Sequence, residues 1–164
     1  MIIGQPASGK STLARLLGAR TGLPVGHLDH IHRQPGWVPR PEDDKIRLIR
    51  AEEEKPACII EGGLSRTWDT RLARANMLVW INVGLALRLW RVLARSWRFR
   101  GRSRPDMTAG CPEHFDRDTL VFLWFILRTW RPGLHRMCRV FAARDRPEVE
   151  LRSLAQTRAW LAAL

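Results

Sequence analysis

The sequence predicts an α/β protein with a five-stranded parallel sheet that is covered by helices on both faces. Short apolar segments alternate with longer helical segments along the chain. These apolar segments lack polar–apolar alternation, which is typical of strands buried on both faces of a parallel sheet. The chain has 164 residues, 45% of them hydrophobic, so we expect one packed domain rather than a disordered chain.

The segments expected to form strands are short and apolar. They are Met1–Ile3, Val25–Asp29, Ala57–Glu61, Met77–Asn82 and Val149–Arg152. Only three residues precede Gly4, whereas a strand usually has about five. Two alternatives stay open here: the chain begins a few residues late, or its first strand is unusually short. Gly62-Gly63 ends the third strand.

The expected helices separate these strands. They are Lys10–Arg20, Pro41–Lys55, Thr70–Ala75, Leu85–Arg98, Phe115–Trp130, Gly133–Ala143 and Leu154–Leu164. Gly22 and Pro24 end the first helix. Acidic residues 42–44 fill the first turn of the second helix, where they favour the helix dipole. The segment 101–112 is rich in turn-forming residues and is expected to be a loop.

The segment from Gly4 to Ser11 matches the phosphate-binding pattern GxxxxGK followed by Ser or Thr in full. Its glycines allow backbone conformations in which successive amides point inward, and the following helix adds free N–H groups. Lys10 is expected to reach the β- and γ-phosphates, and Ser11 to ligate Mg²⁺. The motif predicts a three-layer P-loop NTPase fold that binds ATP with Mg²⁺. The expected nucleotide-binding residues are Gly4, Ala7, Ser8, Gly9, Lys10, Ser11 and Thr12.

Further segments in a fixed order accompany this loop over most of the chain. They are His27-Leu28-Asp29, Pro35-Gly36-Trp37, Ile59-Ile60-Glu61-Gly62, Arg71 to Ala75, Val79-Trp80-Ile81 and Arg100 to Asp106. With the loop, they resemble the nucleoside-monophosphate-kinase-like P-loop proteins, and within them the adenylate-kinase-related group often labelled DNA topology modulation proteins. The resemblance implies an acceptor-binding region at about residues 30–56 and a helical, arginine-rich lid at about residues 98–114.

Two carboxylates are expected at the carboxyl edge of the sheet, where such folds bind ligands. Asp29 is expected to end the second strand and to accept a proton from an acceptor hydroxyl or hold a Mg²⁺-bound water. Glu61 ends the third strand, and the resemblance implies that it contacts Mg²⁺ through water. The residues expected to bind the acceptor are Asp29, Arg33, Gly62, Gly63, Arg66 and Arg71, and the arginines among them suit an acidic acceptor. Three histidines lie nearby in the sequence: His27, His30 and His32. Two interpretations stay open: they form a metal site, or they are solvated or hydrogen bonded without a metal.

Arginines recur along the long helix and beyond it with no acidic residue between them. They are Arg88, Arg91, Arg95, Arg98, Arg100, Arg102 and Arg104. The first four share one helix face, where like charges repel, so we expect an anion to offset them. Residues 98–102 resemble the RxxGR that opens the adenylate kinase lid. The resemblance implies that Arg98 lies over the adenine and that Arg102 reaches the terminal phosphates as a catalytic residue beside Lys10, Asp29 and Glu61.

The composition indicates which kinds of partner and which cellular compartment to expect. The formal net charge is +12, which favours anionic partners. Three cysteines without a CxxC pair favour a reducing cytoplasm, and no apolar run is long enough to span a membrane. Core packing is expected to explain most of six tryptophans: Trp80, Trp90, Trp97, Trp124, Trp130 and Trp160.

The resulting hypothesis is an ATP-dependent kinase that moves the γ-phosphoryl group to a small acceptor, which could itself be a nucleotide. Two other functions stay open. One is an ATP-binding, nucleic-acid-associated protein, and the other is a regulator that hydrolyses ATP slowly. The sequence specifies neither the acceptor nor the oligomeric state.

Overall fold

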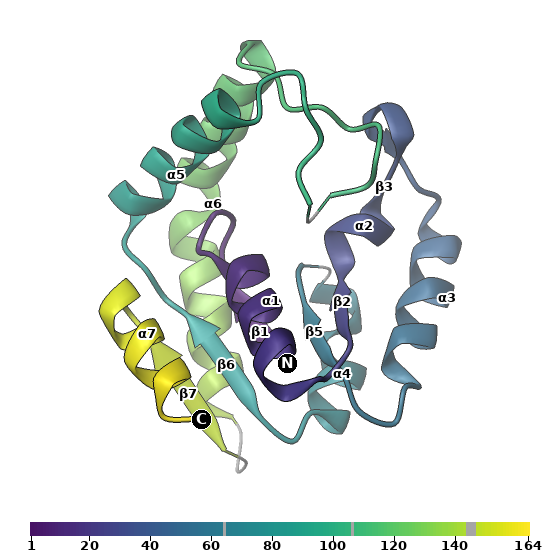
Figure 1. Cartoon of the computed structure of the whole chain (residues 1–164), viewed down its shortest axis with the longest axis vertical. Helices are drawn as coiled ribbons and strands as arrows, with labels where there is room; N and C mark the ends of the chain where they lie inside the picture. Colours follow the sequence, from purple (N-terminus) through teal and green to yellow (C-terminus); the bar gives the residue numbers. More distant parts are fainter. Residues whose placement is uncertain (64, 106, 144–146) are drawn as a thin grey trace.

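A parallel sheet of five short strands forms the centre of the molecule (Figure 1). These strands are β1 (Ile2–Gly4), β2 (Val25–His27), β5 (Ile59–Glu61), β6 (Leu78–Ile81) and β7 (Glu148–Leu151). In this computed structural model, which describes residues 1–63, 65–105, 107–143 and 147–164, they follow the order β2-β5-β1-β6-β7. Every pairing between them is parallel, so the predicted sheet is confirmed. The first strand has three residues and still pairs with both of its neighbours.

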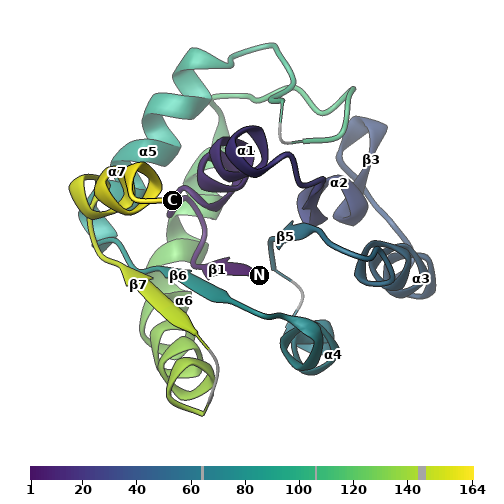
Figure 2. The same cartoon turned by 60° about the horizontal axis from the view of Figure 1, so that its bottom comes forward.

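Helices connect these strands. They are α1 (Lys10–Thr21), α2 (Leu28–His32), α3 (Glu42–Glu53), α4 (Trp68–Arg74), α5 (Leu85–Arg98), α6 (Arg117–Ala142) and α7 (Leu154–Ala162), with 3-10 turns at Pro35–Trp37 and Ser65–Thr67. Figure 2 shows α1 and α7 on one face of the sheet and α4 and α6 on the other. The chain therefore has the three layers expected for this class of fold. No helix in the described part of the chain is long and apolar enough to cross a membrane.

The two faces of the sheet bury separate apolar clusters because successive strand residues point to opposite faces. On the α1 and α7 side, Ile2 and Ile81 pack with Leu13 of α1. On the α4 and α6 side, Ile3 and Trp80 belong to a second cluster. A third, smaller cluster lies at the β2 edge, where α2 and α3 contribute buried leucine and isoleucine side chains.

Residues 117–142 form one helix, where the sequence predicted two helices; that prediction was wrong. Pro132 lies inside α6, where a proline removes one backbone hydrogen bond and usually kinks the helix. Tertiary contacts hold the helix together across this point. Met137 is buried in the cluster beneath the sheet, and Gln5 donates a 2.6 Å hydrogen bond to the carbonyl oxygen of Trp130.

Asp29 was predicted to end the second strand. It lies instead in the first turn of α2, because β2 already ends at His27. The following segment contains a small element that was not predicted. Strands β3 (Arg33–Gln34) and β4 (Val38–Pro39) pair in antiparallel fashion around the turn at Pro35–Trp37. Strands of two residues are too short to show any periodicity in the sequence.

The predicted lid is an extended loop and not a helical element. Its described residues, 99–105 and 107–116, contain no helix and make two isolated bridges, Arg100 with Glu113 and Ser103 with Pro112. In Figure 1 this loop leaves the end of α5, reaches toward α2 and β3, and returns to the start of α6. It therefore spans the two sides of the molecule.

Three of the tryptophans that were expected to pack in the core are exposed. Trp90, Trp97 and Trp124 have 63%, 70% and 64% of their surface accessible, so core packing does not explain them. On α5, Trp90 and Trp97 are exposed, whereas Arg88 on the inner side of the helix is only 1% exposed. The usual direction of an amphipathic helix, apolar side inward, is thus partly reversed in α5.

Candidate functional site

The phosphate-loop motif forms the connection between β1 and α1. Gly9 precedes α1 with a φ of 104°, in the left-handed region that favours glycine. Ala7 also has a positive φ, of 60°, and the amide of Ser8 donates to the carbonyl oxygen of Gln5 at 3.2 Å. No side chain caps the first turn of α1, and that turn carries no acidic residue. Its free N–H groups are therefore available to an anion such as a phosphate.

The Lys10 side chain folds back over this loop. Its Nζ donates to the carbonyl oxygen of Gln5 at 3.1 Å. Burial lowers the pKa of Lys10 below its ordinary value, while the negative charges of Glu61 and Asp29 act in the opposite direction. Lys10 thus lies in a partly desolvated place, where its charged form attracts an anion more strongly than a lysine in open water does.

Two arginines of α5 hold the phosphate loop from behind. Arg88 donates from Nε to the carbonyl oxygen of Pro6 at 2.9 Å and from Nη1 to Oε1 of Gln5 at 2.5 Å. Arg91 donates from Nη1 to the carbonyl oxygen of Ser8 at 2.5 Å. Burial lowers the pKa of both guanidinium groups. Backbone and side-chain amide oxygens of the loop therefore accept hydrogen bonds from two of the four arginines on this helix face.

A histidine–carboxylate pair lies beside the loop at the carboxyl ends of two neighbouring strands. His27 of β2 and Glu61 of β5 are register partners, and Nδ1 of His27 lies 2.7 Å from Oε1 of Glu61. Glu61 is 1% exposed, and its Oε2 makes no hydrogen bond within the described residues. A carboxylate oxygen of this kind is chemically suited to a cation or to a water molecule bound to a cation.

A cleft of about 1850 Å³ opens above the phosphate loop. On one side it is bounded by α5 and α7, and on the other by α2, the β3–β4 turn and the loop between α5 and α6. Its charged and aromatic lining residues include Lys10, Asp29, His32, Arg33, Trp37, Lys45, Trp90, Arg91, Arg95, Arg98, Phe99, Arg104, Asp118, Phe122 and Arg158. The volume exceeds the 300–1,000 Å³ of an ordinary ligand pocket, so the cleft has room for a nucleotide and a second small molecule.

The loop between α5 and α6 is hydrogen bonded across this cleft to the segment around β3. The hydroxyl of Thr108 lies 3.0 Å from the carbonyl oxygen of His30 and 2.8 Å from that of Arg33. The indole of Trp37 donates to the carbonyl oxygen of Pro112 at 2.9 Å. A backbone bond from Gly36 to Gly110 joins the same two segments. The predicted lid and acceptor segments therefore contact each other directly.

An ion pair fixes the loop on its inner side. Arg104 and Glu113 are both buried, and Nε of Arg104 lies 2.6 Å from Oε1 of Glu113. Arg95 lies with its guanidinium carbon 5.2 Å from the ring centre of Phe122, in a cation–π contact between α5 and α6. The ion pair joins two segments of the loop to each other, and the cation–π contact joins the two helices that the loop connects.

The structure brings together some of the predicted site residues and not others. Loop residues 7–12, together with Asp29, Arg33 and Arg98, line the cleft. Arg66 lies on the surface next to Glu42. Arg71 is buried, and its Nη2 donates a hydrogen bond to the carbonyl oxygen of Gly63. The predicted residues outside the cleft lining are Gly4, Glu61, Gly62, Gly63, Arg66, Arg71 and Arg102. Asp106, which belongs to the predicted lid segment, lies outside the described residues.

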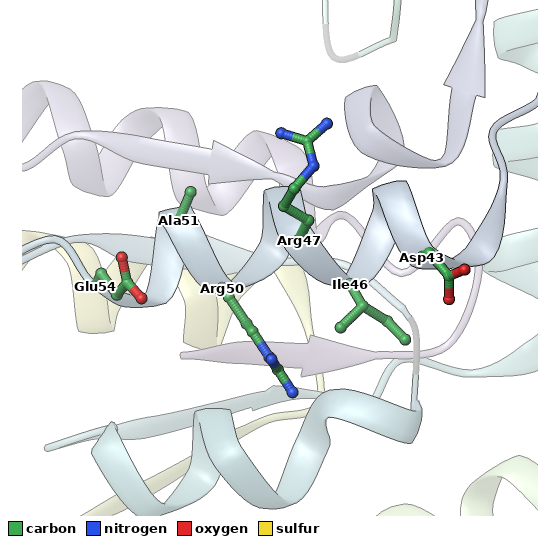
Figure 3. Close-up of a pocket in the computed structure, with 6 residues that line it drawn as sticks. All are labelled: Asp43, Ile46, Arg47, Arg50, Ala51 and Glu54. Atoms are coloured by element: carbon green, nitrogen blue, oxygen red, sulfur yellow. The ribbon is translucent and has the colours of Figure 1, made fainter.

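A second, smaller hollow of about 400 Å³ lies on α3 (Figure 3). It is lined by Asp43, Ile46, Arg47, Arg50, Ala51 and Glu54. Figure 3 shows Arg47 and Arg50 projecting to opposite sides of the helix, so their guanidinium groups do not converge on one ligand. The chemistry-bearing side chains gather at the phosphate loop, which makes the large cleft the candidate site.

The side chains fit Mg²⁺ only as part of a nucleotide complex. In the described residues, His, Cys, Asp and Glu side chains form no cluster of three or more that could hold a metal ion by themselves. Mg²⁺ commonly keeps several waters and takes few protein ligands beside phosphate oxygens. The hydroxyl of Ser11, at the cleft wall, and the orphaned oxygen of Glu61 are of the right chemical kind for this role.

Sequence reasoning missed several residues around the site. The pairing of Gln5 with Arg88 depends on where α5 packs, and the pairing of His27 with Glu61 depends on strand order. Neither has a local signal in the sequence. The β3–β4 turn had one, because Pro35-Gly36 is a turn-forming pair.

Comparisons with known proteins support the fold. No protein-family model matches the chain, and no curated protein matches it. The crystal structure of TT1252 from Thermus thermophilus is similar, with a TM-score of 0.53 and 19% sequence identity over 99% of this chain and 95% of that one. At this identity the likeness concerns the fold alone. The chain has an α/β fold with a five-stranded parallel sheet, of the three-layer kind found in P-loop NTPases, and the resemblance to adenylate-kinase-related proteins stays a prediction.

Proposed function

We propose that this protein is a phosphotransferase that moves the γ-phosphoryl group of ATP to a small acceptor. The observation that carries the proposal is the complete phosphate-loop motif at the base of a cleft with two sides. One side, lined by residues of α5 and α7, would take the nucleoside of ATP. The other side carries a carboxylate and several cations, which suits an anionic acceptor with a hydroxyl group.

On the nucleotide side, the free amides at the start of α1 and the Lys10 ammonium would bind the phosphate chain. Arg91 and Arg88 would keep the loop in its binding shape through its carbonyl oxygens. Ser11 and, through water, Glu61 would hold Mg²⁺, which when bound offsets the negative charge of the phosphates. Positioning and charge neutralisation are the main sources of rate acceleration in phosphoryl transfer.

On the acceptor side, Asp29 lines the cleft close enough to Lys10 to affect its pKa. Its carboxylate would orient the acceptor hydroxyl or accept its proton. Arg33 and Lys45 line the same wall and would bind acidic groups of the acceptor. The loop between α5 and α6 closes this side through Thr108 and Trp37, which would exclude water during transfer.

The second candidate function is an ATP-binding protein that associates with nucleic acid, which the net charge of +12 favours. Salt separates the two candidates, because nucleic-acid binding that depends on phosphate contacts falls steeply as salt rises. No DNA binding at about 50 mM salt would exclude this second candidate.

The proposal is tested by screening acceptors for ADP production. Nucleoside monophosphates, nucleosides, and small sugars or acids are offered with Mg²⁺ and ATP to the purified protein. We expect one class to raise ADP production well above the rate without acceptor, and Lys10→Ala to abolish this increase while the fold stays intact. A folded Lys10→Ala protein with full activity would refute the proposed mechanism.

A further inference from the structure

His27 and Glu61 form a short polar contact between two largely buried side chains next to the phosphate loop. The two residues are register partners on the neighbouring strands β2 and β5, both at the carboxyl end of the sheet. Nδ1 of His27 lies 2.7 Å from Oε1 of Glu61, and the two side chains are only 11% and 1% exposed. A bond at this distance within a buried pair fixes the plane and rotation of the carboxylate.

The other carboxylate oxygen of Glu61 is unused within the described residues. Oε2 is buried and has no hydrogen-bond partner there. Leaving such an oxygen without a partner is costly, and an apolar pair of similar size would serve stability equally well. The arrangement therefore indicates that Oε2 is kept for a partner that arrives with the ligand.

The place of the pair identifies the kind of partner. Glu61 contributes electrostatically at Lys10, so its charge acts on the phosphate loop. Neither His27 nor Glu61 lines the cleft itself, which argues against His27 as a base that touches the acceptor. A carboxylate close enough to Lys10 to affect its pKa is suited to hydrogen bond a water molecule of a nucleotide-bound Mg²⁺.

We propose that His27 is a positioning residue: it holds the Glu61 carboxylate by Oε1 so that Oε2 is oriented for the hydration shell of Mg²⁺. The inference rests on the proposed function, because it assumes that the loop binds a nucleotide with Mg²⁺. It adds a residue that no part of the phosphate-loop motif includes. His27 acts through Glu61 and touches neither the nucleotide nor the acceptor.

The test measures the Mg²⁺ concentration at which ATP binding is half-maximal, by calorimetry at fixed protein and ATP. His27→Leu removes the donor, and we expect it to raise this concentration about 10- to 100-fold, the usual effect of losing a residue that orients a metal-binding group. His27→Asn places an amide N–H where Nδ1 lies, and it should stay within about threefold of the wild type. ATP binding in EDTA should be equal in all three proteins.

A matched control comes from the neighbouring histidine. The ring of His30 lies 5.4 Å from that of His27, and His30 is exposed. His30→Leu removes an imidazole of the same size nearby and should leave the Mg²⁺ dependence unchanged. If His27→Leu fails to fold, Glu61→Gln replaces it, because the amide keeps the shape, can still accept from His27, and lacks the negative charge. It should shift the Mg²⁺ dependence in the same direction.

The outcomes separate the two proposals. A wild-type protein that binds no ATP, with or without Mg²⁺, would refute the proposed function and the inference with it. A wild type that binds Mg²⁺ and ATP, with no shift in His27→Leu or in Glu61→Gln, would overturn the inference alone. An equal shift in His27→Asn and His27→Leu would also overturn it, since it would show that the hydrogen bond to Glu61 is not what matters.

Discussion

Replacing Arg88 by methionine tests whether α5 holds the phosphate loop in shape. The substitution removes two hydrogen bonds from a charged donor, to Pro6 and Gln5, worth about 3–6 kcal/mol together. Burial lowers the pKa of Arg88 from its ordinary value to about 10, which corresponds to about 3 kcal/mol spent on burying its charge. Because these terms oppose each other, we expect Arg88→Met to lose only about 0–3 kcal/mol of unfolding free energy in urea.

The same substitution should also weaken ATP binding. The hydrogen bond to Pro6 fixes a part of the loop backbone that the ligand would otherwise have to order. Its loss should weaken ATP binding by about 1.5–3 kcal/mol, which is a roughly 10- to 150-fold rise in Kd measured by calorimetry. Arg50→Met is the control, since Arg50 is exposed on α3, and it should change stability by less than about 0.5 kcal/mol. Unchanged ATP affinity in a folded Arg88→Met protein would refute the reasoning.

Three further predictions concern the loop and the cleft. Burial lowers the pKa of Lys10 below its ordinary value of 10.5, and only the charged form of Lys10 binds a phosphate chain. ATP affinity measured by calorimetry should therefore be full below this lowered pKa and should fall as the pH rises through it. Lys10→Arg should show no such fall. Gly4→Ala would place a methyl group 2.6 Å from Oγ of Ser8 and 2.8 Å from the carbonyl oxygen of Ile81, so urea unfolding should show a loss of about 1–3 kcal/mol, and unchanged stability would contradict the loop geometry. Thr108→Val removes the hydroxyl that joins the α5–α6 loop to the β3 segment, which should cost about 0.5–1.5 kcal/mol of local stability. Amide hydrogen exchange should become faster in residues 107–116. Unchanged exchange would argue against this contact.

The parts of the fold that the sequence predicted are those with strong local signals. Helix α5 has the predicted bounds, Leu85–Arg98, and the five parallel strands follow short apolar runs. Pro132 misled the prediction of α6, because the contacts that carry the helix past it come from Gln5 and from the sheet. These contacts are distant in sequence and leave no local pattern. The β3–β4 pair was missed because its strands have two residues each.

The candidate site was predictable from the sequence where one continuous segment contains all the residues of a binding element. The phosphate loop is such a segment, and it lies where the motif predicts, between β1 and α1. The direction of the arginines on α5 was not predictable, because the spacing shows that they share a face and not what that face meets. Arg88 and Arg91 point to the carbonyl side of the loop only because α5 packs behind it. The partner of Glu61 likewise follows from β2 lying beside β5.

Calorimetric titration of the wild-type protein and of Lys10→Ala with ATP, in the presence of Mg²⁺, tests the central claim most directly. The claim predicts saturable binding by the wild type and an affinity at least about 10-fold weaker in Lys10→Ala, because a charged contact to the phosphates is lost. A well-folded wild-type protein that takes up neither ATP nor GTP would contradict it.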